Sequence, residues 1–382
     1  MQLIYLDNAA SSWPKPPEVA KAVAHTIETC GANPGRGAHE MAVAASRVLF
    51  DTRMNVAKLI GASNPNDIAF CLNTTDALNL AIRGYVRPGD HVVCTSVEHN
   101  AVWRPVEYMK KHNEVEVSYV EANERGELDM ESLEQAFRPD TRLLICSHSS
   151  NLLGSILPLQ ELARIAHKHS ARILVDAAQT LGVYPLDVQE LQLDMVAFPG
   201  HKGLLGPQGT GGIYIHPDIE LEPLRLGGTG SRSEEADQPM IRPDRYEAGT
   251  LNTPGIAGLN EGVKYVLNET VESIHAREWG LTQKLMQAFT AMSGVRVLGP
   301  EIGEPRTGIV SITLDAMDAS EAAFVLDQHF HIAVRAGYHC SPLAHRTAGT
   351  MGTGAVRISV GCFTTEEDVQ ACIDAVEQLS RS

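Results

Sequence analysis

The stretch from Val196 to Gly212 reads VAFPGHKGLLGPQGTGG, and it decides what kind of fold this chain adopts. It begins as a short apolar run that is typical of a buried strand, and it continues into a glycine-rich loop. His201 and Lys202 follow the predicted strand directly. In open sheets built from parallel strands, ligand sites lie at the carboxyl ends of the strands. We therefore expect Lys202 to face a site at that edge of the sheet.

Similar apolar runs alternate with helical patterns on both sides of this stretch. We expect buried strands in DIAFCL, HVVCTS, VEVSYV, RLLICSH, RILVDA, DMVAFPG and GGIYIHP. Helical patterns occur between them in TTDALNLAIRGYV, NAVWRPVEYMKKH and LPLQELARIAHKHS. This βαβ rhythm predicts an α/β fold with a mostly parallel seven-stranded sheet and helices on both faces.

The pattern changes at about residue 256, where one or two long helices are expected. Strand-like RVLG, GIVSITL, IAVRAG and AVRISVG follow, together with helical DASEAAFVLDQHF and TEEDVQACIDAVEQL. We expect a large α/β domain over residues 16–255 and a small α+β C-terminal domain over residues 256–382. Residues 1–15 are expected to form a segment that packs on these domains.

Composition excludes some classes of partner. The net charge of −16 disfavours nucleic acid and anionic membranes, because their phosphates attract basic residues. No apolar run approaches the roughly 20 residues that span a bilayer. The start, MQLIYLDNAASSWPKPPEVA, lacks the basic and apolar regions of a signal peptide. We expect a cytoplasmic protein.

The seven cysteines lie far apart, without the CxxC pairs or Cys/His spacing of a structural zinc site, so no metal is expected. In the cytoplasm they should be free thiols. Cys71, Cys94 and Cys146 lie inside apolar strand-like runs, which predicts that they fill the core. Cys340 differs, because in RAGYHCSP it follows a strand-like run and precedes a Ser-Pro turn.

Polar side chains at other strand ends complement Lys202. Asp176 closes the strand-like run RILV, and an Asp and a Lys at two strand ends suit a pyridoxal phosphate (PLP) enzyme. There the lysine forms a Schiff base, and the aspartate keeps the pyridine nitrogen protonated so that the ring accepts electrons. His99 follows another strand, where its ring can stack on a planar cofactor, and Gln179 can reach the ring hydroxyl. An ion pair on a loop is the alternative interpretation of Asp176 and Lys202 alone.

A phosphate site gives an independent indication. Thr74 and Thr75 begin a predicted helix, where free N–H groups and hydroxyls bind anions. A plain helix cap is the alternative interpretation. The occurrence of all these residues at successive strand ends favours a cofactor site.

Several motifs carry a resemblance to a known family, above all GHK together with RAGYHC and RISVG. The full set is YLDNAA (5–10), GANPGRGAHE (31–40), NTTDALNLA (73–81), SVEHNAV (96–102), SNLLGSILP (150–158), VDAAQTLG (175–182), GHKGLLGPQGTGG (200–212), YEAGTLNTP (246–254), RAGYHCSPL (335–343) and AVRISVGCFTTEEDV (355–369). From about residue 5 to its end the chain resembles the group II cysteine desulfurases of the class V aminotransferases, a branch that includes selenocysteine lyases.

The resemblance implies a fold type I PLP-dependent transferase, working as a homodimer with its sites at the interface. It implies that Lys202 is the catalytic Schiff-base lysine, that Asp176 pairs with the pyridine nitrogen, and that Gln179 contacts the ring hydroxyl. His99 would stack on the ring as a catalytic residue. The phosphate would be bound by Thr74 or Thr75, by His201, and by Thr250 acting on the partner subunit's cofactor.

The resemblance also implies the substrate contacts and the reaction. Arg357 would bind the substrate carboxylate, Asn151 would lie near substrate and cofactor, and Arg335 would line the site beside Cys340. L-cysteine would become L-alanine, with its sulfur left as a persulfide on Cys340 for a sulfur-acceptor protein or thiol. Because the nucleophile must be a thiolate, Arg335 and His339 are expected to favour that form. The short segment SPLAHRTAGTMGTG predicts an ordered loop of limited reach.

One position departs from the family pattern. Pro199 stands before GHK, where the family usually has a Ser or Thr whose hydroxyl binds the phosphate, so one phosphate contact is missing. Three other functions stay open: a selenocysteine lyase, another class V aminotransferase or C–S lyase, and a non-catalytic scaffold with this fold. The combination of Lys202, Asp176, Cys340 and Arg357 argues against the scaffold.

Overall fold

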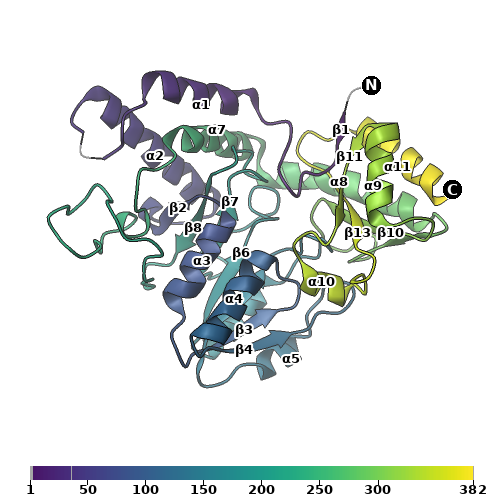
Figure 1. Ribbon diagram of the computed structural model, residues 1–382, viewed down its shortest axis with the longest axis horizontal. Helices are drawn as coiled ribbons and strands as arrows, with labels where there is room; N and C mark the ends of the chain where they lie inside the picture. The colour runs from purple at the N-terminus through teal and green to yellow at the C-terminus, as the bar shows by residue number, and fades with distance from the viewer. Residues whose placement is uncertain (1–2, 36, 382) are drawn as a thin grey trace.

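The computed structural model describes residues 3–35 and 37–381. Parts of the predicted ranges 1–15 and 256–382, and Arg36 in the motif GANPGRGAHE, therefore lie outside the described residues. In Figure 1 the large sheet occupies the centre, with a second, smaller group of strands and helices beside it. No helix in the described part is long and apolar enough to cross a membrane.

The central sheet has the seven strands that the sequence predicts, in the order β2-β8-β7-β6-β5-β3-β4. The pairs from β7 through β4 are parallel, and β8 runs antiparallel to both of its neighbours. The strands are β2 (Ile68–Cys71), β3 (His91–Thr95), β4 (Glu116–Val120), β5 (Thr141–Ser147), β6 (Arg172–Asp176), β7 (Met195–Pro199) and β8 (Gly211–Ile215). The expected mostly parallel α/β sheet is confirmed.

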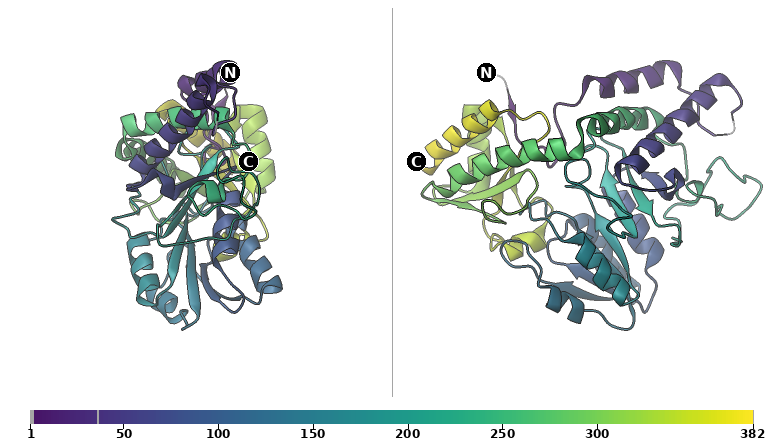
Figure 2. Two further views of the ribbon diagram at one scale, coloured as in Figure 1. Left: turned by 90° about the vertical axis from the view of Figure 1, so that its left-hand side faces the viewer. Right: turned by 180° about the vertical axis from the view of Figure 1, so that it is seen from behind.

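Helices cover both faces of this sheet, as Figure 2 shows where the sheet is seen edge-on. One face packs its apolar side chains on those of α3 (Thr74–Tyr85) and α4 (Asn100–His112). The other face packs on α2 (Glu40–Leu59), α6 (Leu159–Lys168) and α7 (Thr253–Glu269). Since both faces are covered, the strands read as nearly continuous apolar runs.

The smaller group contains a four-stranded sheet in the order β12-β13-β10-β9. Its elements are α8 (Val271–Thr290), β9 (Val295–Val297), β10 (Ile309–Leu314), α9 (Ala319–Phe330), β12 (Arg335–Gly337), α10 (Pro342–Thr347), β13 (Ala355–Ser359) and α11 (Glu366–Ser380). Side chains of α8, α9 and α11 form one apolar core with this sheet. The run IAVRAG, expected as one strand, is split into β11 (Ile332–Ala333) and β12.

The long helical region after residue 256 forms two helices, α7 and α8. Helix α7 packs on α1 (Pro17–Thr29) and on α2, and its Ile256, Leu259 and Val263 belong to the core of the large sheet. It therefore lies with the large sheet, whereas α8 lies with the small one. The division between residues 255 and 256 stays a prediction.

The N-terminal segment touches both parts of the molecule. Strand β1 (Ile4–Tyr5) pairs in parallel with β11 beside the small sheet. Seven residues after β1, the Ser12 hydroxyl donates to the carbonyl oxygen of Lys202 at 2.9 Å. This segment therefore connects the small sheet to the loop after β7.

A buried ion pair supports the edge of the large sheet. The Arg53 guanidinium donates to both carboxylate oxygens of Glu247, at 2.5 and 2.6 Å, and both side chains are almost fully buried. The Phe70 backbone N–H also donates to Glu247, and Arg53 donates to the Ile68 carbonyl oxygen. These bonds hold β2 against α2 and satisfy both charges.

Candidate active site

A cavity of about 220 Å³ lies at the carboxyl ends of the parallel strands, where the small sheet meets the large one. Residues from both parts line it, from the loops after β6 and β7 and from the loop after β12. Among the lining residues are Thr74, Thr75, His99, Asn151, Asp176, Gln179, His201, Lys202, Arg335, Cys340 and Arg357. The structure thus brings together every site residue expected from the sequence except Thr250.

Thr250 and Pro199 are not among the residues that line this cavity. Thr250 lines a different hollow, together with Arg53 and the glycines of the segment Gly228–Gly230. Its expected partner is a second subunit, so its role stays a prediction. Pro199 is the buried last residue of β7, and it offers no hydroxyl or N–H at that position.

Asp176 and Lys202 line the same cavity because β6 and β7 are parallel neighbours. Asp176 ends β6 and is 4% exposed, and one of its carboxylate oxygens accepts the Ala178 N–H at 2.9 Å. Burial raises the pKa of Asp176. Burial, aided by the charge of Arg357, lowers the pKa of Lys202 to about 8. A larger share of the Lys202 amine is therefore neutral than in a free lysine, as a Schiff-base nucleophile requires.

Free hydrogen-bond donors gather at the start of α3. Asn73 caps this helix by accepting the Asp76 N–H at 3.0 Å. The N–H groups of Thr74 and Thr75 make no hydrogen bond within the described residues, and His201 Nδ1 is buried without a partner there. We call Thr74, Thr75 and His201 the donor corner. Unpaired donors at a helix N-terminus fit an anion such as a phosphate.

His99 caps α4 and presents a neutral ring. Its Nδ1 accepts the Ala101 N–H at 3.0 Å. Burial first, and the charge of Lys202 second, lower the pKa of His99 to about 4. Because Nδ1 accepts a hydrogen bond, the single proton of the neutral ring is on Nε2.

The arrangement fits PLP. A buried carboxylate and an amine lie at neighbouring strand ends, a neutral imidazole lines the same cavity, and the donor corner lacks partners that a phosphate would supply. Gln179 is positioned by donating to the Ala9 carbonyl oxygen at 3.2 Å.

Arg357 is positioned by the N-terminal segment, which sequence reasoning did not foresee. It lies in β13, opposite Arg335 of β12, and is 2% exposed. Its Nη2 donates to Asp7 at 2.9 Å and its Nη1 donates to the Asn151 carbonyl oxygen at 3.1 Å. Its Nε is buried without a partner in the described part. A buried guanidinium needs a counter-charge, and Asp7 in YLDNAA supplies it.

Cys340 lies between β12 and α10, and it is the exposed member of the cysteines, the other six being half-buried or buried. His339 and Cys340 have φ values of 50° and 57°, in the left-handed region that residues with a Cβ rarely adopt. The Cys340 carbonyl oxygen accepts the Asn100 N–H at 2.8 Å, at the start of α4. The backbone of this loop is therefore tied to the start of α4.

Asn151 holds the loop on both sides of Cys340. Its Nδ2 donates to the His339 carbonyl oxygen at 2.8 Å, and its Oδ1 accepts the Ser341 hydroxyl. The residue expected near the substrate thus has a further role, since its amide fixes the residues before and after the thiol. No local pattern marks Ser341 for this role.

His339 does not have the charge that the sequence suggested. Burial lowers its pKa to about 3, so the ring is neutral at physiological pH. It supplies no positive charge that would favour a Cys340 thiolate. Of the two residues expected to favour the thiolate, only Arg335, an exposed cation that lines the cavity with Cys340, can supply a positive charge.

A family model described as "Aminotransferase class-V" matches residues 4–372. The chain belongs to the class-V aminotransferase family. A probable cysteine desulfurase of Methanothermobacter thermautotrophicus is 36% identical, over 99% of this chain and 94% of the relative. A cysteine desulfurase of Haloferax volcanii is 33% identical, over 98% of this chain and 89% of the relative.

Solved structures of this family have the same fold. The apo structure of a cysteine desulfurase from Thermococcus onnurineus NA1 matches with a TM-score of 0.92 and 30% identity, covering 99% of this chain and 95% of that one. An S-sulfonic acid form of the Escherichia coli cysteine desulfurase CsdA matches with a TM-score of 0.90 and 25% identity, over the same shares. These matches confirm the expected family and fold.

Two of the three cysteines that were predicted to fill the core, Cys94 and Cys146, lie in it. Cys94 and Cys146 are fully buried, and burial raises the pKa of both thiols well above the ordinary value. Cys71 is half-buried at the side of the core. The thiols of Cys94 and Cys146 are enclosed, whereas Cys340 opens onto the cavity.

Proposed function

We propose that this chain is a PLP-dependent cysteine desulfurase that converts L-cysteine to L-alanine and keeps the sulfur as a persulfide on Cys340. One observation carries the proposal: the exposed Cys340 lines the same cavity as the Asp176–Lys202 pair and the buried Arg357. A thiol in that place has a substrate to attack. The relatives that bear the name cysteine desulfurase over nearly their whole length support it.

The residues divide the binding of PLP among them. Lys202 would hold it as a Schiff base, Asp176 would keep its ring nitrogen protonated, and the donor corner would bind its phosphate. His99 would lie on the ring, and Gln179 would contact the ring hydroxyl. The bound cofactor supplies an electron sink that allows the substrate Cα proton to leave.

The chain's own groups carry out the remaining steps. Arg357, which lines the cavity, binds the substrate carboxylate, because a planar guanidinium suits a carboxylate. The Lys202 amine, with its lowered pKa, takes the Cα proton. The Cys340 thiolate then attacks the substrate sulfur, so that an S–S bond forms, the substrate C–S bond breaks, and its electron pair stays on carbon. Protonation at that carbon, Cβ, and the return of a proton to Cα then give alanine, while the substrate sulfur stays on Cys340 as a persulfide.

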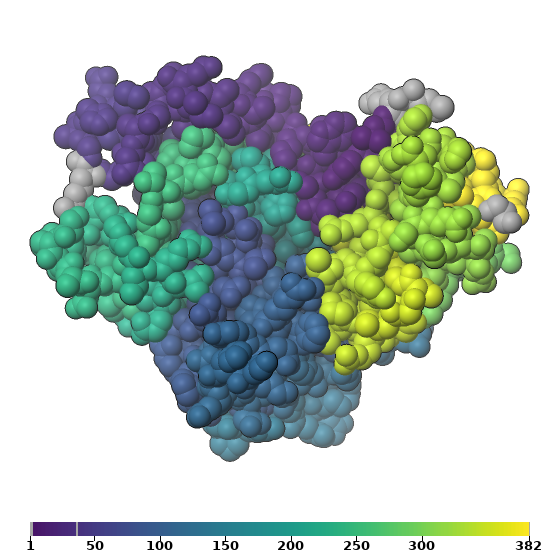
Figure 3. All heavy atoms as spheres, in the orientation of Figure 1, coloured from purple at the N-terminus to yellow at the C-terminus, as the bar shows by residue number. Residues whose placement is uncertain are grey.

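A homodimer is part of the proposal. Exposed apolar side chains lie on α1 and α2 (Ile27, Val43, Phe50 and Met54) and on the segment that contains Leu226, Met240 and Ile241. Figure 3 shows these two regions together on one flank of the molecule. Pairing this flank with a second subunit would bury them and would bring Thr250 toward the partner's phosphate. A sulfur-acceptor protein and a cytoplasmic location also stay predictions.

The test is the comparison of Cys340→Ala with wild type, using Cys30→Ala as a matched control at a half-buried cysteine. With L-cysteine, we expect alanine and sulfide production to fall at least about 100-fold in Cys340→Ala and to stay unchanged in the control. Full activity of Cys340→Ala would contradict the persulfide role.

Selenocysteine separates the nearest alternative. Selenium leaves more readily than sulfur, so a selenocysteine lyase depends less on a nucleophilic cysteine. If Cys340→Ala and wild type turn over L-selenocysteine equally fast, and wild type hardly uses L-cysteine, the lyase is the correct function. Accumulation of pyridoxamine phosphate would indicate an aminotransferase instead.

A further inference from the structure

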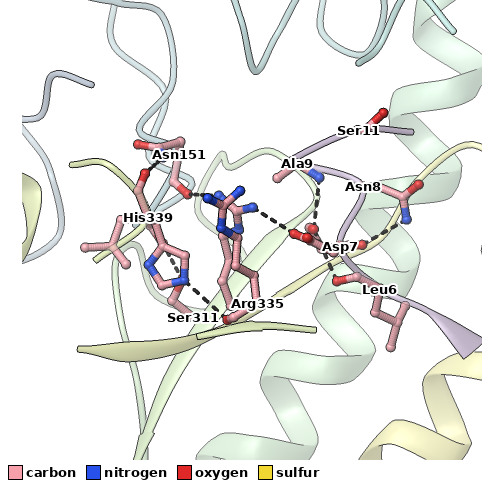
Figure 4. A network of polar contacts seen from close by, with 12 residues as sticks. Leu6, Asp7, Asn8, Ala9, Ser11, Asn151, Ser311, Arg335 and His339 are labelled. Carbon is pink, nitrogen blue, oxygen red and sulfur yellow. Dashed lines mark hydrogen bonds and ion pairs between the residues drawn. The ribbon is translucent and has the colours of Figure 1, made fainter. Parts of the chain in front are cut away.

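A chain of buried hydrogen bonds extends from the Cys340 loop into the small domain. His339 Nε2 lies 3.3 Å from the Arg335 carbonyl oxygen, a contact drawn in Figure 4. His339 Nδ1 lies 3.2 Å from His345 Nε2, and His345 Nδ1 lies 2.7 Å from the Thr350 hydroxyl. The planes of the two imidazoles are 8° apart, so the rings lie nearly parallel. His345 is fully buried, and His339 and Thr350 are buried almost as deeply.

The direction of each hydrogen bond follows from the acceptor at the end of the series, the Arg335 carbonyl oxygen. A carbonyl oxygen only accepts, so His339 Nε2 carries the proton and donates to Arg335. His339 Nδ1 must then accept from His345 Nε2, and His345 Nδ1 must accept from the Thr350 hydroxyl. Each ring has one proton, which agrees with the effect of burial, since it lowers the pKa of His339 to about 3 and of His345 to about 4.

This chain of hydrogen bonds fixes a conformation and does not conduct protons. It ends on a backbone carbonyl oxygen, which has no proton to pass on, so no proton enters the cavity along it. It does fix the His339 ring at the point where the backbone turns left-handed for two residues, His339 and Cys340. Such a conformation persists in residues with a Cβ only where surrounding contacts hold it.

We propose that His345 and Thr350 are positioning residues for the Cys340 nucleophile: the chain Thr350–His345–His339 fixes the left-handed turn that presents the thiol to the substrate sulfur. The inference rests on the proposed desulfurase function and adds two residues outside the cavity to it. Neither residue lines the cavity, so both act through His339.

Thr350 offers a matched set of variants. Thr350→Val keeps the shape and removes the hydroxyl, which leaves His345 Nδ1 buried without a donor, whereas Thr350→Ser keeps the hydroxyl. Thr353→Val is the control, because Thr353 is exposed and its hydroxyl bonds only to the neighbouring Gly354 carbonyl oxygen in the described part.

The experiment measures kcat and KM of the PLP-loaded enzymes with L-cysteine and L-selenocysteine, and the rate of Cys340 alkylation by iodoacetamide. For Thr350→Val we expect kcat with L-cysteine to fall about tenfold at unchanged KM, with a fall below about threefold for L-selenocysteine. The rate of Cys340 alkylation in Thr350→Val should fall as well. Thr350→Ser and Thr353→Val should stay within about twofold of wild type.

The outcomes are distinct. Equal kinetics of Thr350→Val and Thr350→Ser, or equal losses with the two substrates, would overturn the inference, since a general loss of structure affects both substrates alike. If Thr350→Val fails to load PLP, the variants His345→Leu and His345→Gln are compared instead. Glutamine supplies a donor and an acceptor, so the rate of Cys340 alkylation should be restored in His345→Gln and not in His345→Leu. Equal alkylation rates in these two variants would overturn the inference. Absence of desulfurase activity in wild type would instead contradict the proposed function, while the alkylation rates would still test the chain.

Discussion

The two halves of the cavity are held in different ways. The sheet half, with Asp176 and Lys202, is positioned by parallel strands, so that its residues follow from where β6 and β7 end (Figure 1). The loop half combines Cys340, in the loop after β12, with Arg357 of β13, and side-chain bonds to residues distant in the chain, such as Asn151 and Asp7, also hold it. The first half depends on regular backbone pairing, and the second depends also on individual hydrogen bonds that single substitutions can remove.

Removing Lys202 gives the largest expected effect on the sheet half. Lys202→Ala should lose the Schiff-base absorbance band at about 420 nm and at least about 1,000-fold in activity, because no other lysine is among the described residues that line the cavity. Absorbance spectra of the purified enzymes, with and without added PLP, check this. A variant that keeps both band and activity would place the Schiff base elsewhere.

The support beneath the sheet half is tested by Glu247→Gln. It leaves the Arg53 guanidinium buried without a counter-charge, and we expect it to lower the free energy of unfolding by about 3–5 kcal/mol. Urea denaturation followed by circular dichroism measures the change. Glu235→Gln, which weakens the exposed pair with Arg232, should cost far less, because solvent screens that pair. If both variants lower the free energy of unfolding by the same small amount, the buried Arg53–Glu247 pair is not a main support of the large sheet.

Arg357→Lys probes the loop half. Lysine keeps the charge but loses the planar edge and the bonds to Asp7 and Asn151, so KM for L-cysteine should rise about tenfold or more. Steady-state kinetics check it, with Arg346→Lys, an exposed arginine on α10, as the control. If the two variants have the same KM, Arg357 is not the carboxylate ligand.

Sequence reasoning recovered the sheet half because strand ends are local features. Asp176 and Lys202 could be named from two apolar runs and the residues that follow them. The supports of the loop half could not, because Asn151 and Ser341 meet only after folding, and nothing in the run SPLAHRTAGT distinguishes His345 as a buried ring. His339 was also expected to favour the Cys340 thiolate, and only the observed burial shows that its ring is neutral.

The helical pattern after residue 256 illustrates the same limit. Periodicity indicated that helices occur there, and α7 and α8 confirm it. It did not indicate which core each helix joins, since an apolar face packs equally well on either sheet. The contacts of α7 with α1 and α2 show that it lies with the large sheet.

The smallest effect concerns the titration of Lys202 in the cofactor-free protein. Because its pKa is lowered to about 8, the neutral amine increases as the pH rises through that value. The rate of Schiff-base formation with PLP should therefore rise about fivefold from pH 7 to 8 and less than about twofold from pH 8 to 9. Stopped-flow absorbance measures it, with a free lysine derivative as the reference. A rate that keeps rising steeply above pH 9 would show an unperturbed amine.

The most direct test of the account is mass spectrometry of the peptide that contains Cys340, after the PLP-loaded enzyme is incubated with L-cysteine and quenched with an alkylating agent. We expect this peptide to gain one sulfur atom and the peptides of Cys94 and Cys146 to gain none. A Cys340 peptide without added sulfur, while alanine is still formed, would contradict the account.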